Sequence, residues 1–365
     1  MRIIYYVDSS DAVNWGGQAT SAGIRHLVET TYPKAGFIPT KFRPLPLKQA
    51  TFLRWIPNLM IYWCVKNRRL DWLKAVLHWY GIDRNIYDEF DVVCFNGEGA
   101  IHEKSGHFFR LLGSLYAFKL SGKRVYSLNQ TVDVHPGSLA ARLLQLVYPV
   151  LDRVAVREPA SLRVITGLGV NAELIGDAAY ALPLIPDAER AALARKFYIA
   201  KPFVAVTASS AMARNRSSVD RMARLLDTLS GLGLRMIFLA NTKTDLYLAK
   251  KLAGRHDFRI IDYTAANYRE AIAIISLAEL IVGGRQHPNI FAAKYGVPFI
   301  ALAGNTHKMS GVVELLNYPL PVFTWDFDAN ELSSTARRIL AGEVDFSQVS
   351  LPVINTIDLG HDATS

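Results

Sequence analysis

Arg285 and His287 stand two positions apart where an apolar run, residues 280–282, gives way to a helical pattern. An arginine offers a planar fork that binds carboxylate or phosphate through two hydrogen bonds. Pro288 suits the first position of a helix, so His287 is expected at or just before the helix start, near free backbone N–H groups that favour an anion. A bound anion would help the imidazole to take up a proton, which suits a general acid. The structural alternative is that Arg285 pairs with a surface carboxylate and His287 only caps the helix.

The elements that would position these side chains alternate along the chain. Short runs rich in β-branched residues are separated by longer stretches with apolar residues at helical spacing, an order typical of parallel sheets. The sequence therefore predicts an α/β fold of two doubly wound, Rossmann-like domains with a cleft between them. The predicted strands are 2–8, 90–97, 124–130, 153–158 and 172–177, then 203–209, 235–241, 258–262, 279–284 and 298–304.

The break between the two series falls at Pro183 and Pro186, which interrupt the pattern. We expect an N-terminal domain over residues 1–185 and a C-terminal domain over 186–345, which carries Arg285 and His287. The last residues, 346–365, form a tail without clear period, and the sequence leaves open whether it returns to the first domain. Two domains agree with a length of 365 residues, which exceeds what one hydrophobic core usually supports.

Composition and charge describe an ordinary globular protein. Hydrophobic residues make up 50% and charged residues 20%, and 41 basic against 32 acidic residues give a net charge of +9. This excess suits an acidic substrate, a membrane surface or nucleic acid, and does not choose among them. Cys64 and Cys94 lie far apart without metal-ligand spacing, so reduced thiols are expected. The first apolar run is too short for a signal peptide, and no segment approaches the roughly 18 apolar residues of a membrane span. We therefore expect a cytoplasmic protein.

Residues 283–302, GGRQHPNIFAAKYGVPFIAL, resemble the signature of the polysaccharide pyruvyl transferase family, in which Arg-x-His at a helix start precedes a small apolar helix and a Gly-x-Pro strand entry. Other motifs follow in the family's order over roughly residues 1–320. They are Asn14 and Gly16 after the first strand, Gly97 and Gly99 after a buried strand, Gln130 after the next strand, Arg157 and Ser161 in VREPAS, and Asp177 in GDAAY.

Three loop positions depart from the family's common pattern. Gln286 stands between the arginine and the histidine where leucine is common, Gly17 replaces an acidic residue, and Glu98 replaces a third glycine. These changes leave the donor site in place and bear on the acceptor.

The resemblance implies a reaction. Members of the family transfer pyruvate from phosphoenolpyruvate to two hydroxyls of a sugar, leaving a cyclic ketal and inorganic phosphate, and are similar in architecture to two-domain GT-B glycosyltransferases. Phosphoenolpyruvate would be the donor substrate, with no cofactor and no metal. The acceptor would be a sugar of a surface polysaccharide or of its lipid-linked precursor. Arg157 and Arg285, from different domains, would each bind an anionic group of the donor, and His287 would protonate the enol ether carbon.

Further candidates rest on loop position. Glu98 and His135 are candidates to accept a hydroxyl proton, although Glu98 could instead bind sugar hydroxyls and His135 could cap its loop. Asn305, His307 and Lys308 would contact a charged acceptor or the bound phosphate, or would cap the following helix. The remaining predicted substrate-binding residues are Asn14, Gly16, Gly97 and Gln130.

Residues 52–80 combine tryptophans with basic side chains. They hold Trp55, Trp63, Trp72 and Trp79 together with Arg54, Lys66, Arg68, Arg69 and Lys74. Such a mixture suits the headgroup layer of a membrane, which predicts peripheral attachment. A helical pair packed on the first sheet, or at the interface of an oligomer, is the alternative.

Other signals are weaker. His102, Glu103 and His107 do not share one helical face, so no metal is expected there. No glycine-rich loop matches a dinucleotide or NTPase fingerprint, and no motif indicates nucleic acid. The basic segment 214–224 either binds a diphosphate or is a solvated loop. Two alternative functions remain: a GT-B glycosyltransferase that uses a nucleotide sugar, and a catalytically silent binding protein.

Overall fold

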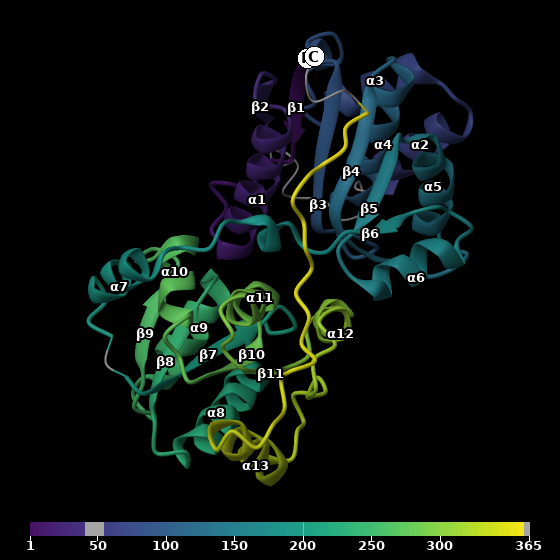
Figure 1. Cartoon of the computed structure of the whole chain (residues 1–365). Helices are drawn as coiled ribbons and strands as arrows, with labels where there is room; N and C mark the ends of the chain where they lie inside the picture. Colours follow the sequence, from purple (N-terminus) through teal and green to yellow (C-terminus); the bar gives the residue numbers. More distant parts are fainter. Residues whose placement is uncertain (41–54, 200, 361–365) are drawn as a thin grey trace. The chain divides into compact units, whose positions relative to one another are not determined.

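The computed structural model describes residues 1–40, 55–199 and 201–360, which form two compact units, each built on its own parallel sheet (Figure 1). Unit 1 comprises the described residues of Met1–Ser9, Gly23–Ala178 and the segment from Ile354. Unit 2 comprises those of Ser10–Ala22 and Ala179–Val353. Two doubly wound α/β units confirm the predicted fold class, whereas the cleft between the domains stays a prediction.

The sheet of unit 1 has six parallel strands in the order β2-β1-β3-β4-β5-β6. Five of them correspond to predicted strands, and β2 was not predicted. Pro39 lies in β2, at the edge of the sheet, where a residue that cannot donate a ladder hydrogen bond is tolerated. The strands are β1 (Arg2–Tyr6), β2 (Gly36–Thr40), β3 (Val92–His102), β4 (Arg124–Asp133), β5 (Arg153–Val156) and β6 (Glu173–Leu174).

Helices of unit 1 bury a large apolar core against this sheet. Helices α2 to α5 pack on one another (Figure 1). Their inward residues include Ile61, Leu77 and Leu112, all fully buried. Helix α1 (Trp15–Thr31) belongs to unit 1 from Gly23 onward and to unit 2 before it. The other helices of unit 1 are α2 (Trp55–Lys66), α3 (Leu70–Trp79), α4 (Phe108–Leu120), α5 (Leu139–Val147) and α6 (Pro159–Gly167), with short 3-10 turns η2 (Arg84–Tyr87) and η3 (Tyr148–Val150).

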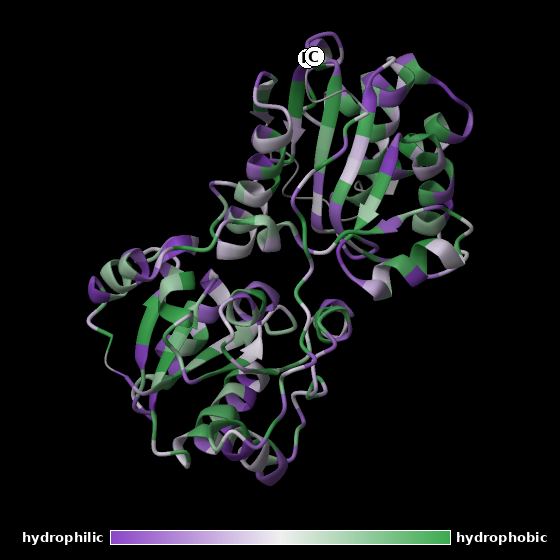
Figure 2. Ribbon diagram, in the orientation of Figure 1, coloured by the Kyte–Doolittle hydropathy of each residue, from purple (hydrophilic) through white to green (hydrophobic). Residues whose placement is uncertain are grey.

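The sheet of unit 2 has five parallel strands in the order β11-β10-β7-β8-β9. All five strands were predicted. The strands of both sheets consist largely of hydrophobic residues (Figure 2). The strands are β7 (Phe203–Ser209), β8 (Arg235–Ala240), β9 (Arg259–Asp262), β10 (Leu280–Gly284) and β11 (Phe299–Ala301). The helices are α7 (Asp187–Arg195), α8 (Arg216–Ser230), α9 (Lys243–Leu252), α10 (Tyr268–Ile275), α11 (Gln286–Lys294), α12 (Lys308–Leu315) and α13 (Ala329–Leu340), with a 3-10 turn η4 (Ala178–Ala181).

The division of the chain differs from the predicted first domain of residues 1–185. Residues 10–22 belong to unit 2, because the Trp15 indole donates to the carbonyl of Ala266 at 2.6 Å and its backbone N–H donates to Asn241 at 2.8 Å. Unit 2 also takes residues from Ala179 onward. The ammonium of Lys294 holds that segment by donating to the carbonyls of Tyr180, at 2.6 Å, and Leu182.

The C-terminal tail returns to unit 1. The carbonyls of Asp358 and Gly360 accept hydrogen bonds from Arg153 and Arg124, at 3.1 and 2.8 Å. The backbone N–H of Leu359, which is fully buried, donates to the Tyr32 hydroxyl. These contacts settle the question that the sequence left open, because long-range hydrogen bonds carry no periodic signal in the tail itself.

Candidate functional site

Arg285 and His287 lie at the carboxyl end of β10, where helix α11 begins. Arg285 is the N-cap residue, Gln286 is the first helical residue, and His287 is the second. This corrects the prediction that the helix starts at Pro288. A proline is tolerated in the first turn because its missing N–H would have no partner inside the helix there. The predicted proximity of both side chains to the positive end of α11 is confirmed.

Arg285 is held by residues that follow β8, which is separated from β10 by β7 in the sheet. Its Nε donates to Oδ2 of Asp245 at 3.0 Å, its Nη2 bonds the other carboxylate oxygen, and Nη2 also donates to the Thr242 hydroxyl at 2.9 Å. Asp245 is fully buried, and Thr242 caps the helix that carries it. The partner carboxylate is thus internal, which differs from the surface carboxylate of the structural alternative. The bonds to Asp245 and Thr242 use Nε and Nη2 of Arg285. The third guanidinium nitrogen, Nη1, forms no hydrogen bond among the described residues.

Asp245 has an unusual environment for a carboxylate. Burial raises its pKa, and the adjacent Arg285 guanidinium together with the Thr242 hydroxyl opposes that shift. A buried charge is stable only when it is paired and hydrogen-bonded, so this pair fixes where the Arg285 fork points. Sequence reasoning missed Asp245, although its position three residues after a helix-capping threonine at a strand end was a usable signal.

His287 packs against the segment of unit 2 that starts α1. A Cβ built on Gly16 would lie 2.0 Å from Nδ1 of His287, closer than side-chain atoms approach one another. Glycine is therefore required at this position, because the imidazole occupies the side-chain space. Asn14 caps the same helix, with its Oδ1 accepting the backbone N–H of Gly17 at 2.6 Å. Both residues thus shape the site around His287, and Asn14 is half-buried.

The loop after β11 carries three further predicted residues. Asn305 is tied to the loop after β7, because the Ser210 hydroxyl donates to its Oδ1 at 2.8 Å. His307 is the N-cap residue of α12 and Lys308 its first residue, as the capping alternative expected, yet the His307 side chain makes no capping hydrogen bond. Both side chains are partly buried. The loop ends of β7, β10 and β11 thus lie at one edge of the unit 2 sheet.

In unit 1, three adjacent strands carry strained backbone at or beyond their middle. Val7 directly follows β1, whereas Glu98 and Asn129 lie inside β3 and β4 where the strand register shifts, and their φ angles are 68°, 36° and 53°. Residues other than glycine rarely adopt this left-handed backbone conformation, and such strain concentrates at functional sites. Glu98 is half-buried, and its carboxylate has no hydrogen-bond or ion-pair partner among the described residues. This carboxylate is available to a ligand.

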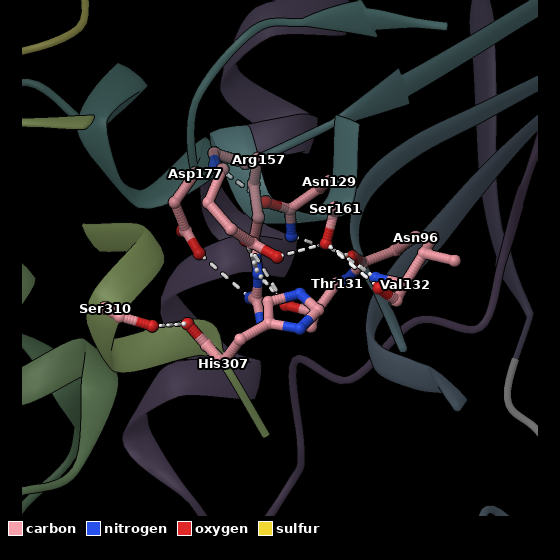
Figure 3. Close-up of polar contacts among 11 residues, drawn as sticks. Asn96, Asn129, Thr131, Val132, Arg157, Ser161, Asp177, His307 and Ser310 are labelled. Atoms are coloured by element: carbon pink, nitrogen blue, oxygen red, sulfur yellow. Dashed lines mark hydrogen bonds and ion pairs between the residues drawn. The ribbon is translucent and has the colours of Figure 1, made fainter. Parts of the chain in front are cut away.

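Arg157 lies inside unit 1 in a dense polar network (Figure 3). Its Nη1 donates to Asp177 at 2.9 Å, its Nε donates to the Thr131 hydroxyl at 2.9 Å, and the Glu158 carboxylate lies 3.4 Å from Nε. The side chain is 2% exposed. The predicted capture of a donor anion by Arg157 therefore requires correction, because two buried carboxylates already neutralise the guanidinium. The bond to Asp177 ties Arg157 to the turn that carries this carboxylate.

Gln130 is also internal, contrary to its predicted contact with substrate. It is fully buried, and its Oε1 accepts hydrogen bonds from the hydroxyls of Tyr148, at 2.7 Å, and Ser127, at 3.0 Å. A Cβ on Gly97 would lie 2.5 Å from Cβ of Gln130, so Gly97 is required for the packing of β3 on β4. Both residues support the irregular part of β3 that carries Glu98, and the predicted ligand contact of Gly97 stays a prediction.

His135 is paired with a carboxylate that the sequence did not assign. Its Nδ1 lies 3.1 Å from Oε2 of Glu103, whose Oε1 accepts the His135 backbone N–H at 2.7 Å. Partial burial acts to raise the pKa of Glu103, but hydrogen bonds from Ser138 and His135 outweigh it and lower the pKa. The imidazole is 81% exposed, so the carboxylate orients a ring that faces solvent. The register that pairs His102 with Asp133 brings these two loops together.

Several weaker signals acquire structural explanations. Arg216 lies 3.9 Å from Asp220 and Arg221 lies 3.6 Å from Asp326, which favours a solvated basic segment. In the described ranges there is no group of three or more His, Cys, Asp or Glu residues that could hold a metal ion. Across the same ranges, every helix is too short or too polar to cross a bilayer. The thiols of Cys64 and Cys94 are free and buried.

Comparison with known proteins agrees with this arrangement. A family model described as polysaccharide pyruvyl transferase matches residues 14–306. No curated protein matches the chain. Among solved structures, UDP-GlcNAc 2-epimerase from Methanocaldococcus jannaschii in complex with UDP-GlcNAc and UDP is similar, with a TM-score of 0.57 and 13% identity over 93% of each chain. The UDP-GlcNAc 2-epimerase from Neisseria meningitidis bound to UDP-GlcNAc has a TM-score of 0.57 and 11% identity, over 100% of this chain and 98% of that chain. These similarities show an α/β fold of the GT-B type.

Proposed function

Because the chain belongs to the polysaccharide pyruvyl transferase family, we propose that it moves pyruvate from phosphoenolpyruvate to two hydroxyls of a sugar. The family makes the protein a transferase enzyme that acts in polysaccharide biosynthesis. The acceptor in this proposal is a surface polysaccharide or its lipid-linked precursor, presented on the cytoplasmic side of the membrane. Phosphoenolpyruvate serves as donor substrate, and the reaction needs no further cofactor.

The observation that carries the proposal is the geometry at the start of α11. Arg285 keeps one guanidinium edge open while Asp245 holds the other edge, and the first N–H groups of α11 carry the positive end of the helix dipole. A small donor with a carboxylate and a phosphate is matched by a fixed cation beside a helix N-terminus. His307 and Lys308, at the start of α12 in the same unit, are proposed to contact the phosphate, with Asn305 holding their loop.

His287 is proposed as the proton donor. Protonation of the methylene carbon of phosphoenolpyruvate leaves a cationic centre at the carbon that carries the phosphate ester. A sugar hydroxyl attacks this centre and forms the first bond to carbon. The second hydroxyl then displaces phosphate, which leaves with the bonding electron pair, and the ketal closes. His287 is second in α11 and is packed against Gly16, which fixes the ring. Proton transfer from a positioned side chain contributes about 10²- to 10⁴-fold to the rate.

Unit 1 is proposed to bind the acceptor. Glu98 offers a carboxylate without a partner among the described residues, on strained backbone inside β3, and is proposed to bind or deprotonate sugar hydroxyls. His135 is the second candidate base, and Glu103 acts as its positioning residue. A carboxylate on Nδ1 leaves Nε2 to accept a proton, which is the arrangement used by His–carboxylate pairs in general-base catalysis.

The test combines ligand binding with turnover. Thermal-shift measurements compare phosphoenolpyruvate with UDP- and GDP-sugars, and phosphate release is followed with phosphoenolpyruvate and a saccharide acceptor. We expect phosphoenolpyruvate alone to stabilise the protein. Stabilisation by a nucleotide sugar alone would favour a glycosyltransferase, and binding without turnover on any acceptor would favour a silent binding protein.

The proton-donor role has its own control. His287→Ala should retain the fold and slow phosphate release by about 10²- to 10⁴-fold. His26→Ala, in the exposed face of α1, should leave the rate unchanged. Turnover at the wild-type rate in His287→Ala would contradict the assignment.

A further inference from the structure

Helices α2 and α3 form a pair with two very different faces. Inward residues such as Ile61, Leu73 and Leu77 are fully buried in the core of unit 1. Outward residues along α2 are also apolar, and they repeat at the spacing of one helical face. These are Ile56, Leu59, Met60 and Trp63, with 41 to 51% of their surfaces exposed.

The outward face of α3 continues this surface. Trp72 and Trp79 lie seven residues apart on one side of the helix and are 65% and 58% exposed. Together the two helices line an apolar hollow of about 470 Å³, formed by Ile56, Pro57, Met60, Trp72, Ala75, Val76 and Trp79. We refer to the exposed apolar residues of α2 and α3 as the tryptophan face. A continuous exposed apolar surface of this kind marks an interaction site.

Unpaired cations flank the tryptophan face. Lys66, Arg68 and Arg69 lie at the turn between α2 and α3, are exposed, and form no ion pair among the described residues. Asp71 is the only acidic residue from 55 to 80. Lys74, by contrast, lies over the ring of Tyr87, 4.5 Å from its centroid, and is already engaged. The cations available to a partner therefore gather at one end of the tryptophan face.

We propose that the tryptophan face docks this protein onto the headgroup layer of a bilayer that contains anionic phospholipids. Tryptophan suits that layer because its ring is largely apolar while its N–H remains hydrated. Lys66, Arg68 and Arg69 would contact lipid phosphates while the apolar side chains enter the acyl boundary. A second copy of the chain fits less well, because residues 55–80 of that copy would offer these cations only one acidic residue, Asp71.

The docking gives the proposed reaction a location. If the acceptor is a lipid-linked saccharide, docking would bring unit 1 to the acceptor at the membrane surface. This use of the docking rests on the proposed function, whereas binding to the bilayer does not. Of the predicted membrane-contact residues, Arg54 lies outside the described residues.

Flotation of the full-length protein with vesicles tests the proposal. Vesicles of phosphatidylcholine alone are compared with vesicles that contain phosphatidylglycerol, at low and high salt. We expect flotation with the phosphatidylglycerol vesicles and its loss at high salt, because the cations act through screened charge. Wild-type protein that does not float with either vesicle would overturn the proposal.

Variants identify the surface. Trp72→Ser combined with Trp79→Ser should reduce the bound fraction at least tenfold, and Lys66→Gln combined with Arg69→Gln should abolish the preference for phosphatidylglycerol. A matched control combines Tyr198→Asn, an 86% exposed aromatic residue of unit 2, with Lys250→Gln, an exposed cation of unit 2. The control should float like the wild type. Equal flotation of all variants would overturn the assignment to this face.

Sedimentation and turnover measurements distinguish membrane docking from dimer formation. If the tryptophan face joins two copies instead, the Trp72→Ser and Trp79→Ser variant will become monomeric in sedimentation while vesicle binding is absent in the wild type. Stabilisation by phosphoenolpyruvate and turnover on a water-soluble saccharide should be unchanged in this variant. Loss of flotation with retained turnover supports docking, whereas absent turnover in the wild type would count against the proposed reaction alone.

Discussion

The imidazole of His287 fills the space that a side chain at Gly16 would need, since a Cβ at Gly16 would lie 2.0 Å from Nδ1. Gly16 is early in the chain and His287 is late, yet both belong to unit 2. The start of α1 therefore acts as a wall that sets the ring orientation of the proposed proton donor.

Substitution of Gly16 by alanine should displace His287 without removing it. A shift of about 1 Å at a catalytic group costs on the order of 100-fold in rate, so we expect a loss of this size in kcat. Gly167→Ala is the matched control, because a Cβ there meets no atom within 4 Å. Steady-state phosphate release is the measurement. A Gly16→Ala enzyme with unaltered kcat would show that the ring position is unimportant.

The Asp245 carboxylate should matter to stability as well as to geometry. Asp245→Asn leaves the largely buried Arg285 without its counter-charge, and breaking such a pair costs about 3 kcal/mol. Urea unfolding followed by circular dichroism measures the change. Combining Asp245→Asn with Arg285→Met should recover part of the loss, because the uncompensated charge is then removed. Additive losses in the double variant would contradict this coupling.

Glu103 should affect turnover through His135 alone. Glu103→Gln is expected to lower kcat about tenfold, less than the roughly 10²- to 10⁴-fold that a general base itself contributes because Glu103 acts only by positioning His135, while KM for phosphoenolpyruvate stays unchanged. Glu103→Asp should restore part of the rate. With His135→Ala as background, Glu103→Gln should have no additional effect. A decrease of similar size in both backgrounds would indicate a merely structural role.

Lys294 should make the free energy of unfolding depend on pH. Burial lowers its pKa to about 8 from an ordinary value of 10.5, so the unfolded chain holds this proton to higher pH than the folded protein. The free energy of unfolding should therefore rise between about pH 8 and pH 10.5 through this residue. The Lys294→Met variant lacks that contribution. Subtracting the unfolding free energy of the variant from that of the wild type at each pH cancels the contributions of the other titrating groups. A difference that does not change over this range would contradict the lowered pKa.

Local sequence determined much of this protein. Alternating strand and helix patterns are set by side chains close in sequence, which is why ten of the eleven strands in the described part of the chain and the start of α11 near Arg285 and His287 were predictable. The missed strand, β2, contains Gly36 and Pro39, and these weaken the pattern at a sheet edge. Motif order also identified the family, because it depends on residue type along the chain.

Tertiary structure decided which charges are free. Asp245 lies 40 residues from Arg285, and Asp177 lies 20 residues from Arg157, so no local period indicates either pair. The folded sheets place one buried carboxylate beside one edge of Arg285 and two buried carboxylates beside Arg157. Two arginines that follow strands in similar loops, Arg157 and Arg285, therefore differ in how much of the guanidinium is free to bind a ligand. The physical reason is that burial and pairing depend on neighbours from distant parts of the chain, which only the folded sheet brings together.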